Sequence, residues 1–231
     1  MVISIKHIAA AVVMAAAVCV GIKLATDRAE KPVFNSERNF KVILDAGHGE
    51  PDGGAVGISG TLEKDINLAI VQKLQETLEG KGIEVVLTRS DDSGLQDESA
   101  NTIREMKKSD MRKRREIVKD SGADLFLSIH MNSFADSSIN GLHIFYDKEH
   151  PEIEETAKRI QDKIGEVTGA PTHAVKTADE RLFLMKNPPI PSILIECGFL
   201  SNPEEEKKLA DENYQAKIAW AIASSVENYT K

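Results

Sequence analysis

The sequence predicts an α/β fold, with a sheet that carries helices on both of its faces. Short β-branched runs alternate with segments of helical periodicity from residue 40 to residue 229, and such alternation favours an α/β sheet. The chain of 231 residues is 41% hydrophobic and 29% charged, which supplies a sizeable core and argues against disorder. This length fits one large domain better than two.

Five strands are predicted from short apolar runs that are bounded by turn residues. The first, residues 40–45, is rich in β-branched side chains and is closed by Gly47 and Gly49, as expected of a buried strand. The others are residues 83–88, 125–129, 142–146 and 192–196. We expect the centre of the sheet to form from these five segments.

Helical segments are predicted between and after the strands. In residues 65–78 apolar side chains recur every four residues and Gly80 follows, so a helix ends there. The others are the basic stretch 110–119, residues 152–167, and a tail, residues 203–229, that we expect to form two helices. Residues 90–109 form a polar segment whose length indicates either a functional loop or a short helix of its own.

The N-terminal segment, residues 1–25, has the form of an export signal or a membrane anchor. Residues 8–22 carry no charge and have a lysine on each side. A helix there would rise about 22 Å against roughly 30 Å of hydrocarbon, and snorkelling lysines would let it span. We expect residues 26–39 to be a linker and residues 40–231 to be exported, either secreted or held at the outer face of the cytoplasmic membrane.

The charge balance excludes one class of function. Lys and Arg number 29 against 37 for Asp and Glu, which gives a net charge of −8. This argues against a nucleic-acid-binding protein that depends on a broad basic surface, and it leaves an uncharged polymer as a substrate. The two cysteines, Cys19 and Cys197, are too few for a disulfide framework.

Side chains with metal-binding chemistry stand at the ends of three predicted strands. His48 follows the first strand, His130 the third and Glu196 the last, while Glu63 lies just before the first helix. Ligands of α/β proteins bind at the carboxyl ends of strands. Two imidazoles and one carboxylate are a standard donor set for a catalytic zinc that keeps an open position for water. Glu196 would then be free to act as general base.

Each of these residues also has a purely structural interpretation. A histidine at a strand end often only makes a hydrogen bond, Glu63 suits the first turn of a helix, and Glu196 fits a strand-end charge. The other histidines of this region, His143, His150 and His173, are weaker ligand candidates, because they lie within a strand or in loops that lack the glycine and small polar neighbours of the first two.

Three rival patterns are weak. The glycine-rich loop 47–54 has Asp52 where a dinucleotide fingerprint needs glycine, and it lacks the Gly-Lys-Ser/Thr of a P-loop. Cys197 stands next to Glu196, which disfavours a thiolate and argues against a nucleophile. The basic cluster 112–115 is typical of a solvated helix face, with contact to an anionic wall polymer as the alternative.

Blocks of the sequence match one family in order. They are Val42–Gly49, Asp52–Gly57, Glu63–Asp65, Val86–Arg89, Ala123–Asn132 and Ile195–Asn202. Over about residues 40–229 the chain resembles the zinc-dependent N-acetylmuramoyl-L-alanine amidases of the Amidase_3 family. The resemblance implies a single α/β domain with a twisted, mostly parallel (mixed) sheet that is flanked by helices on both faces. It also implies one zinc held by His48, Glu63 and His130, with Glu196 as the catalytic residue. We further expect Asn132 and Arg89 to contact the substrate.

The family resemblance implies a substrate, which is the amide bond between the lactyl group of N-acetylmuramic acid and L-alanine of the peptidoglycan stem peptide. No wall-binding repeats accompany the domain, so the chain is most similar to the germination-specific, CwlD-type group, which acts in spore cortex maturation and muramic δ-lactam formation. Peptidoglycan is the expected partner, and the need for an accessory protein stays open. The alternatives are a zinc peptidase or deacetylase of the cell wall, and a non-catalytic wall-binding protein.

Overall fold

The computed structural model describes residues 39–227 and residue 229. The apolar segment and the linker that the sequence predicts before residue 39 lie outside the described residues. Within the part that is described, no helix is both long and apolar enough to cross a membrane.

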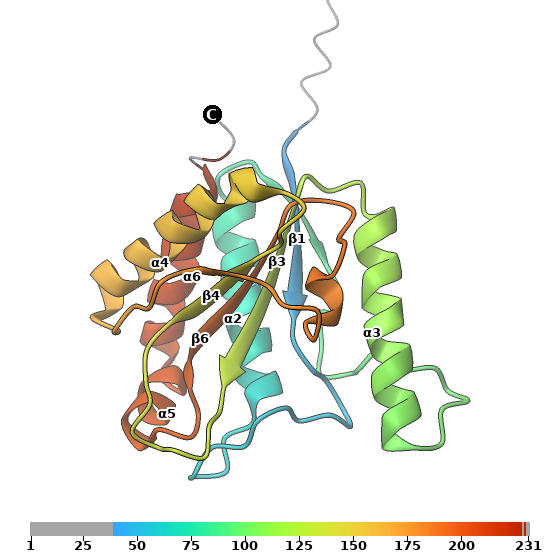
Figure 1. Ribbon diagram of the computed structural model, residues 1–231, viewed down its shortest axis with the longest axis horizontal. Coiled ribbons are helices and arrows are strands. Elements are labelled where there is room, and N and C mark those ends of the chain that lie inside the picture. Colours follow the sequence, from blue (N-terminus) through green and yellow to red (C-terminus); the bar gives the residue numbers. More distant parts are fainter. Residues whose placement is uncertain (1–38, 228, 230–231) are drawn as a thin grey trace, which may run out of the picture. The chain divides into compact units, whose positions relative to one another are not determined.

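The sheet is mixed and mostly parallel, as predicted. Its strands are β1 (Lys41–Ala46), β2 (Glu84–Leu87), β3 (Leu125–Asn132), β4 (His143–Tyr146), β5 (Lys176–Thr177) and β6 (Ser192–Phe199). Their order is β2-β1-β3-β6-β4-β5 (Figure 1). All neighbouring pairs are parallel except β4 and β6. Because β1, β3 and β6 run parallel, their carboxyl ends meet at one edge of the sheet.

Helices cover both faces of the sheet, which confirms the second part of the predicted architecture. The described helices are α2 (Glu63–Glu79), α3 (Ile103–Asp120), α4 (Glu154–Thr168), α5 (Pro203–Leu209) and α6 (Glu212–Glu227), with 3-10 turns at Pro151–Ile153 and Phe183–Met185. Helices α2, α4 and α6 pack together on one face, over the larger apolar core. Helix α3 stands apart on the other face, over a smaller apolar cluster (Figure 1).

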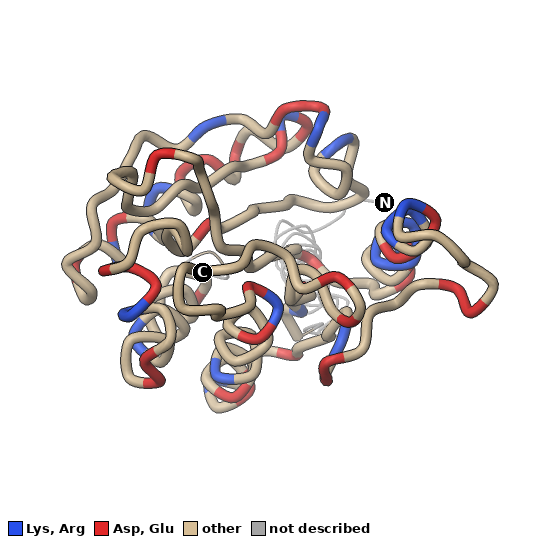
Figure 2. Tube along the Cα trace, turned by 90° about the horizontal axis from the view of Figure 1, so that it is seen from below, with Lys and Arg blue, Asp and Glu red and all other residues tan. Residues whose placement is uncertain are grey.

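Helix α3 begins at Ile103 and not at residue 110, so the second part of the polar segment 90–109 is helical. A capping box explains this start: the Thr102 hydroxyl accepts from the N–H of Glu105, and the Glu105 carboxylate accepts from the N–H of Thr102. Charged residues crowd the helix (Figure 2), which weakens the apolar periodicity that would show its length. The two-residue strand β5 and the turn at Phe183–Met185 are too short for any periodicity.

The basic cluster 112–115 is not simply a solvated helix face, because Arg114 is buried. Its side chain is 1% exposed, and its Nη1 donates to Oδ1 of Asp45 on β1 across 2.6 Å. The hydroxyls of Thr88 and Ser128 donate to the same carboxylate, each at 2.7 Å. A buried carboxylate is tolerated when it has such partners. The pair therefore joins α3 to the central strands of the sheet.

The electrostatics of Asp45 make this pair sensitive to acid. Burial alone would raise the pKa of Asp45, but Arg114, His130 and the two hydroxyl donors lower it from the ordinary 3.8 to about 2. One pKa unit is worth about 1.4 kcal/mol, so the ionised carboxylate contributes ~2 kcal/mol to folding at neutral pH. Because the folded pKa lies below the unfolded one, this contribution is complete above about pH 4 and is lost as the pH falls toward about 2.

Replacing Asp45 with Asn tests this interpretation. We expect Asp45→Asn to lower the free energy of unfolding at pH 7 by about 3–5 kcal/mol, since Arg114 would keep a buried charge without its partner. The difference from the wild type should shrink as the pH falls from about 4 to about 2, where wild-type Asp45 itself takes up a proton. Urea unfolding of both proteins across this range measures the difference, and a value independent of pH would contradict the assignment.

Candidate metal centre and active site

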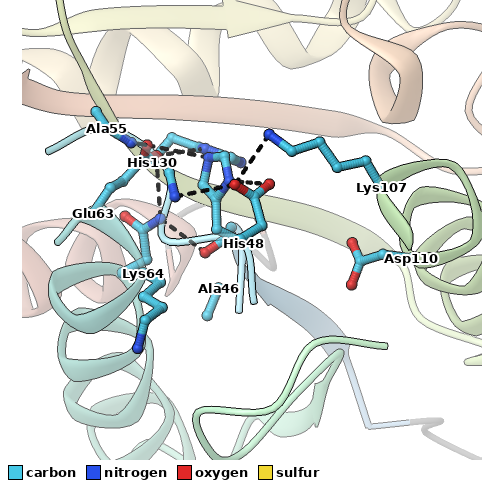
Figure 3. A network of polar contacts seen from close by, with 12 residues as sticks. Ala46, His48, Ala55, Glu63, Lys64, Lys107, Asp110 and His130 are labelled. Carbon is cyan, nitrogen blue, oxygen red and sulfur yellow. Dashed lines mark hydrogen bonds and ion pairs between the residues drawn. The ribbon is translucent and has the colours of Figure 1, made fainter. Parts of the chain in front are cut away.

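The carboxyl edge of the sheet brings together three side chains with metal-binding chemistry. His48 lies in the loop after β1, His130 lies in β3, and Glu63 is the first residue of α2. One ligand atom from each residue lies within 4.8 Å of the other two, as a shared metal ion requires. Figure 3 shows the two imidazoles and the carboxylate pointing toward one another. Among the residues that the structure describes, no other such group of three or more occurs.

Glu63 is the centre of this group. Its Oε2 lies 3.1 Å from Nε2 of His48, and its Oε1 lies 2.9 Å from Nδ1 of His130. The backbone N–H groups of Ala55 and Met131 donate to the same carboxylate, at 2.8 and 3.1 Å. The Glu63 side chain is 4% exposed. The four contacts therefore fix a nearly dry carboxylate between two imidazoles.

Two glycines allow this close approach. A Cβ atom at Gly47 would lie 2.2 Å from the ring of His130, and one at Gly54 would lie 2.5 Å from the carboxylate of Glu63. Gly54 also has a φ of +71°, in the left-handed region that favours glycine. The glycine-rich loop after β1 thus makes room for the metal-binding side chains.

The carboxylates in and around this group create a negative electrostatic potential that stabilises a positive charge. Burial alone would raise the pKa of Glu63, but hydrogen bonds from His130 and His48, and their charges, lower it below its usual range. Burial likewise opposes a charge on His130, yet Glu63, Glu196 and Asp45 raise its pKa to about 9. Surroundings that stabilise an imidazolium also suit a metal cation in place of the proton. Two nitrogens and one carboxylate oxygen fit the donor set of catalytic zinc.

Further residues hold the ligands in place, and the sequence analysis did not assign them this role. Oδ2 of Asp52 lies 3.0 Å from Nδ1 of His48. Nζ of Lys107 on α3, a residue labelled in Figure 3, lies 3.1 Å from Oδ1 of Asp52. Asn67, one turn along α2, donates from Nδ2 to Oε1 of Glu63 at 3.3 Å. A carboxylate on the second ring nitrogen is typical of a metal-binding histidine. The only sequence feature that could have indicated the contact of Asp52 with His48 was their spacing of four residues.

Glu196 lies beside the group, on β6. It is the register partner of His130 on the neighbouring strand. Burial and the nearby charge of Glu63 raise the pKa of Glu196 to about 7, against the opposing effect of the two histidines. Its Oε2 is buried and makes no hydrogen bond to the described residues. Glu196 is therefore a buried carboxylate whose pKa lies near neutrality and one of whose oxygens no described residue engages.

A cavity of about 530 Å³ opens next to His48 and His130, between α3 and the turn at Phe183–Met185. Asp45 and Arg114 line its inner end. Its walls are mostly apolar and include Ile103, Met106, Met111, Leu182, Phe183, Met185 and Leu194. The metal-binding group therefore borders a space of the size that small-molecule sites use.

Arg89 is buried, and its predicted contact with a substrate stays a prediction. The residue is 4% exposed, and each of its three guanidinium nitrogens donates to a backbone carbonyl. The acceptors are Ala46, Gly47, Lys64 and Asp91, at 2.7 to 3.1 Å. Arg89 therefore secures the loop that carries His48. An arginine at a strand end has the same local sequence pattern whether it contacts a substrate or binds backbone carbonyls.

The remaining candidates lie outside the metal-binding group. Asn132 ends β3, where the register with β6 shifts, and its Oδ1 accepts from the N–H of Ser133 at 2.8 Å. Its contact with a substrate stays a prediction.

Cys197 is 1% exposed within the larger core, and burial raises the pKa of its thiol well above the usual range, which disfavours a nucleophilic thiolate. His143 packs edge-on against His173, with ring centroids 4.4 Å apart.

Comparisons with known proteins point to one family. The profile of the Amidase_3 family, N-acetylmuramoyl-L-alanine amidase, matches residues 42–228. The germination-specific N-acetylmuramoyl-L-alanine amidase of Bacillus subtilis is 37% identical over 188 residues, which are 81% of this chain and 78% of that protein.

Solved structures give the same answer. The CwlD amidase from Clostridioides difficile, determined in complex with the GerS lipoprotein, is 45% identical, with a TM-score of 0.80 over 83% of this chain and 98% of that chain. The catalytic domain of CwlV, an N-acetylmuramoyl-L-alanine amidase from Bacillus (Paenibacillus) polymyxa, is 32% identical, with a TM-score of 0.71 over 83% and 98%. The chain therefore belongs to the N-acetylmuramoyl-L-alanine amidase family, a family of hydrolases.

Proposed function

We propose that this protein hydrolyses the amide bond between the lactyl group of N-acetylmuramic acid and L-alanine of the stem peptide in peptidoglycan. One observation carries the proposal. His48, Glu63 and His130 converge within 4.8 Å in a chain whose residues 42–228 match the amidase family. The raised pKa of Glu196, about 7, adds a proton acceptor beside them.

The metal that best suits this group is zinc, one ion per domain. His48 and His130 would each offer a ring nitrogen and Glu63 a carboxylate oxygen, since these atoms already lie within 4.8 Å of one another. Three protein ligands are typical of catalytic zinc, whereas structural zinc has four. A zinc ion held there would supply Lewis-acid polarisation of the scissile carbonyl and activation of the attacking water.

Glu196 is the residue we assign to proton transfer. Its unpartnered Oε2 would accept a proton from the attacking water, because its pKa of about 7 keeps much of it ionised near neutral pH. The protonated carboxyl group would then deliver that proton to the nitrogen of L-alanine as the C–N bond breaks. His48 and Glu63 are held by Asp52 and by backbone N–H groups, which keeps the ligands in place during this exchange.

A role in spore cortex maturation, with formation of muramic δ-lactam, is the biological setting we propose. The support is the identity of 37% to the germination-specific amidase of Bacillus subtilis and of 45% to CwlD. Because that CwlD was solved in complex with the GerS lipoprotein, a lipoprotein is the class of accessory partner we propose for this chain.

Product analysis tests the activity. Incubated with purified peptidoglycan, the zinc-loaded protein should release new free amino groups of L-alanine and no acetate. Acetate as the only product would identify a deacetylase, and new amino ends on other stem-peptide residues would identify a peptidase. Binding without any product would leave a non-catalytic wall-binding protein. Each of these three outcomes contradicts the proposal.

Two glutamine substitutions separate the roles of the glutamates. Glu196→Gln keeps the side-chain shape but removes the proton acceptor, so we expect wild-type zinc content and a loss of turnover of about 10²–10⁴-fold. Glu63→Gln replaces an anionic metal ligand by a neutral amide, so we expect zinc content and activity to fall together.

Metal analysis and turnover measured on the same samples decide between the two roles. His48→Ala and His130→Ala serve as controls that should lose zinc and activity together, as Glu63→Gln does. If Glu196→Gln lost its zinc while Glu63→Gln kept it, the two roles would be reversed. Full zinc occupancy in both histidine variants would refute the metal site itself.

Export is the location we propose for the domain. The support is the uncharged stretch of residues 8–22 between two lysines. A reporter enzyme that is active only outside the cytoplasm, fused after Asn39, should be active in cells. A deletion of residues 8–22 should abolish that activity, and a fusion that stays in the cytoplasm with these residues present would contradict the proposal.

A further inference from the structure

His48 has a backbone conformation that must be held in place. Its φ is +64°, in the left-handed region that residues other than glycine rarely adopt. Such a conformation costs of order 1–3 kcal/mol and persists only where the surrounding structure determines it. His48 also offers an imidazole to the metal-binding group. Whatever holds its backbone therefore also aims that ring.

Arg114 is the side chain that holds the His48 backbone. Its Nη2 donates to the carbonyl oxygen of His48 at 2.5 Å, and its Nη1 donates to the carbonyl oxygen of Ala46 at 2.8 Å. The same guanidinium is anchored by Asp45 at 2.6 Å and by Asp110 at 2.7 Å. The side chain is 1% exposed. Every guanidinium nitrogen of Arg114 thus donates a hydrogen bond. The planar group binds two backbone carbonyls and two carboxylates at the same time.

The same helix also reaches the ring of His48. Lys107, two turns before Arg114 on α3, lies 3.1 Å from Asp52, whose other oxygen lies 3.0 Å from Nδ1 of His48. Helix α3 therefore holds this residue at both its carbonyl group and its imidazole. Arg89 does not duplicate this role, because its bonds in the loop go to the carbonyls before His48.

We propose that Arg114 is a positioning residue for the metal centre, which sets the metal affinity by fixing the backbone and thereby the ring direction of His48. The proposal rests on the metal site proposed above. The hydrogen bonds of Arg114 go to Asp45, Ala46, His48 and Asp110, so its direct link to a metal-binding residue is the carbonyl group of His48. Outer-shell partners of metal ligands typically change metal affinity or activity by 10–100-fold when they are removed.

Zinc titration of full-length variants tests the proposal. Metal-free Arg114→Met should bind zinc about 10–100-fold more weakly than the wild type in competition with a chromophoric chelator. Arg115→Met is the matched control, because Arg115 is the next residue on α3 and donates to the carbonyls of Phe183 and Lys186, away from the metal-binding loop. Its zinc affinity should equal that of the wild type. The visible spectrum of the cobalt-loaded proteins should change in Arg114→Met and stay the same in Arg115→Met.

Two further variants separate positioning from stability. Arg114→Lys keeps the charge beside Asp45 but lacks the fork, so it should fold and still bind zinc more weakly than the wild type. The double variant Asp45→Asn/Arg114→Met removes both charges of the buried pair, so no Asp45 carboxylate is left without its partner. Its unfolding midpoint should therefore be higher than that of Arg114→Met. Its zinc affinity should stay low.

Three results would overturn the inference. These are wild-type zinc affinity in Arg114→Met, wild-type affinity in Arg114→Lys, or a double variant that regains affinity together with stability. The last result would mean that Arg114 serves stability alone. A wild-type protein that binds no zinc would instead overturn the proposed metal site, and this inference with it, so the two failures are distinguishable.

Discussion

The buried carboxylate of Glu63 is the constraint on which the candidate site depends. An anion that is 4% exposed needs compensating donors, and this one has two imidazoles and two backbone N–H groups. These donors come from the loop after β1 and from β3, while the carboxylate itself stands at the start of α2, and the three parts of the chain are far apart in sequence. Satisfying one carboxylate therefore brings three parts of the chain to the same point at the carboxyl edge of the sheet.

A second buried charge, on Arg114, connects this point to helix α3. The guanidinium joins the side chain of Asp45 to the backbone of His48, so the helix and the metal-binding loop share one network. The face of the sheet under α3 accordingly has an apolar part and a polar part. Side chains such as Phe126 and Leu194 form a small apolar cluster there, and nearer the carboxyl edge the same face carries Asp45 and the candidate site. Removing a member of such a network affects more than its own pair.

Two glutamates whose charges interact, Glu63 and Glu196, have opposite electrostatic settings. Glu63 is surrounded by donors and its pKa is lowered, so it stays ionised and suits a metal ligand. Glu196 is buried without a partner for Oε2 and its pKa rises to about 7, so it suits proton transfer. Environments that push the pKa values of nearby acids apart are how one site performs two tasks.

The sequence by itself predicted the α/β class and the five principal strands, and it named the three side chains, His48, Glu63 and His130, that the structure brings within 4.8 Å of one another. These follow from local patterns, because a buried strand needs an apolar run and a strand end is where polar chemistry is placed. The start of α3 at Ile103 was not predicted from the sequence, because a capping box and not apolar periodicity defines it.

Only the tertiary structure decided which charges are buried and what they contact. Arg114 stands among three other basic residues and Arg89 ends a strand, so nothing in their local sequence distinguishes a solvent-exposed or substrate-binding arginine from a buried one. The partners of Arg114 on β1 and in the loop after it are 66 to 69 residues away along the chain, and those of Arg89 are 2 to 43 residues away. The burial of a charge depends on contacts between distant segments, which the packing of α3 over the sheet creates and which local patterns do not encode.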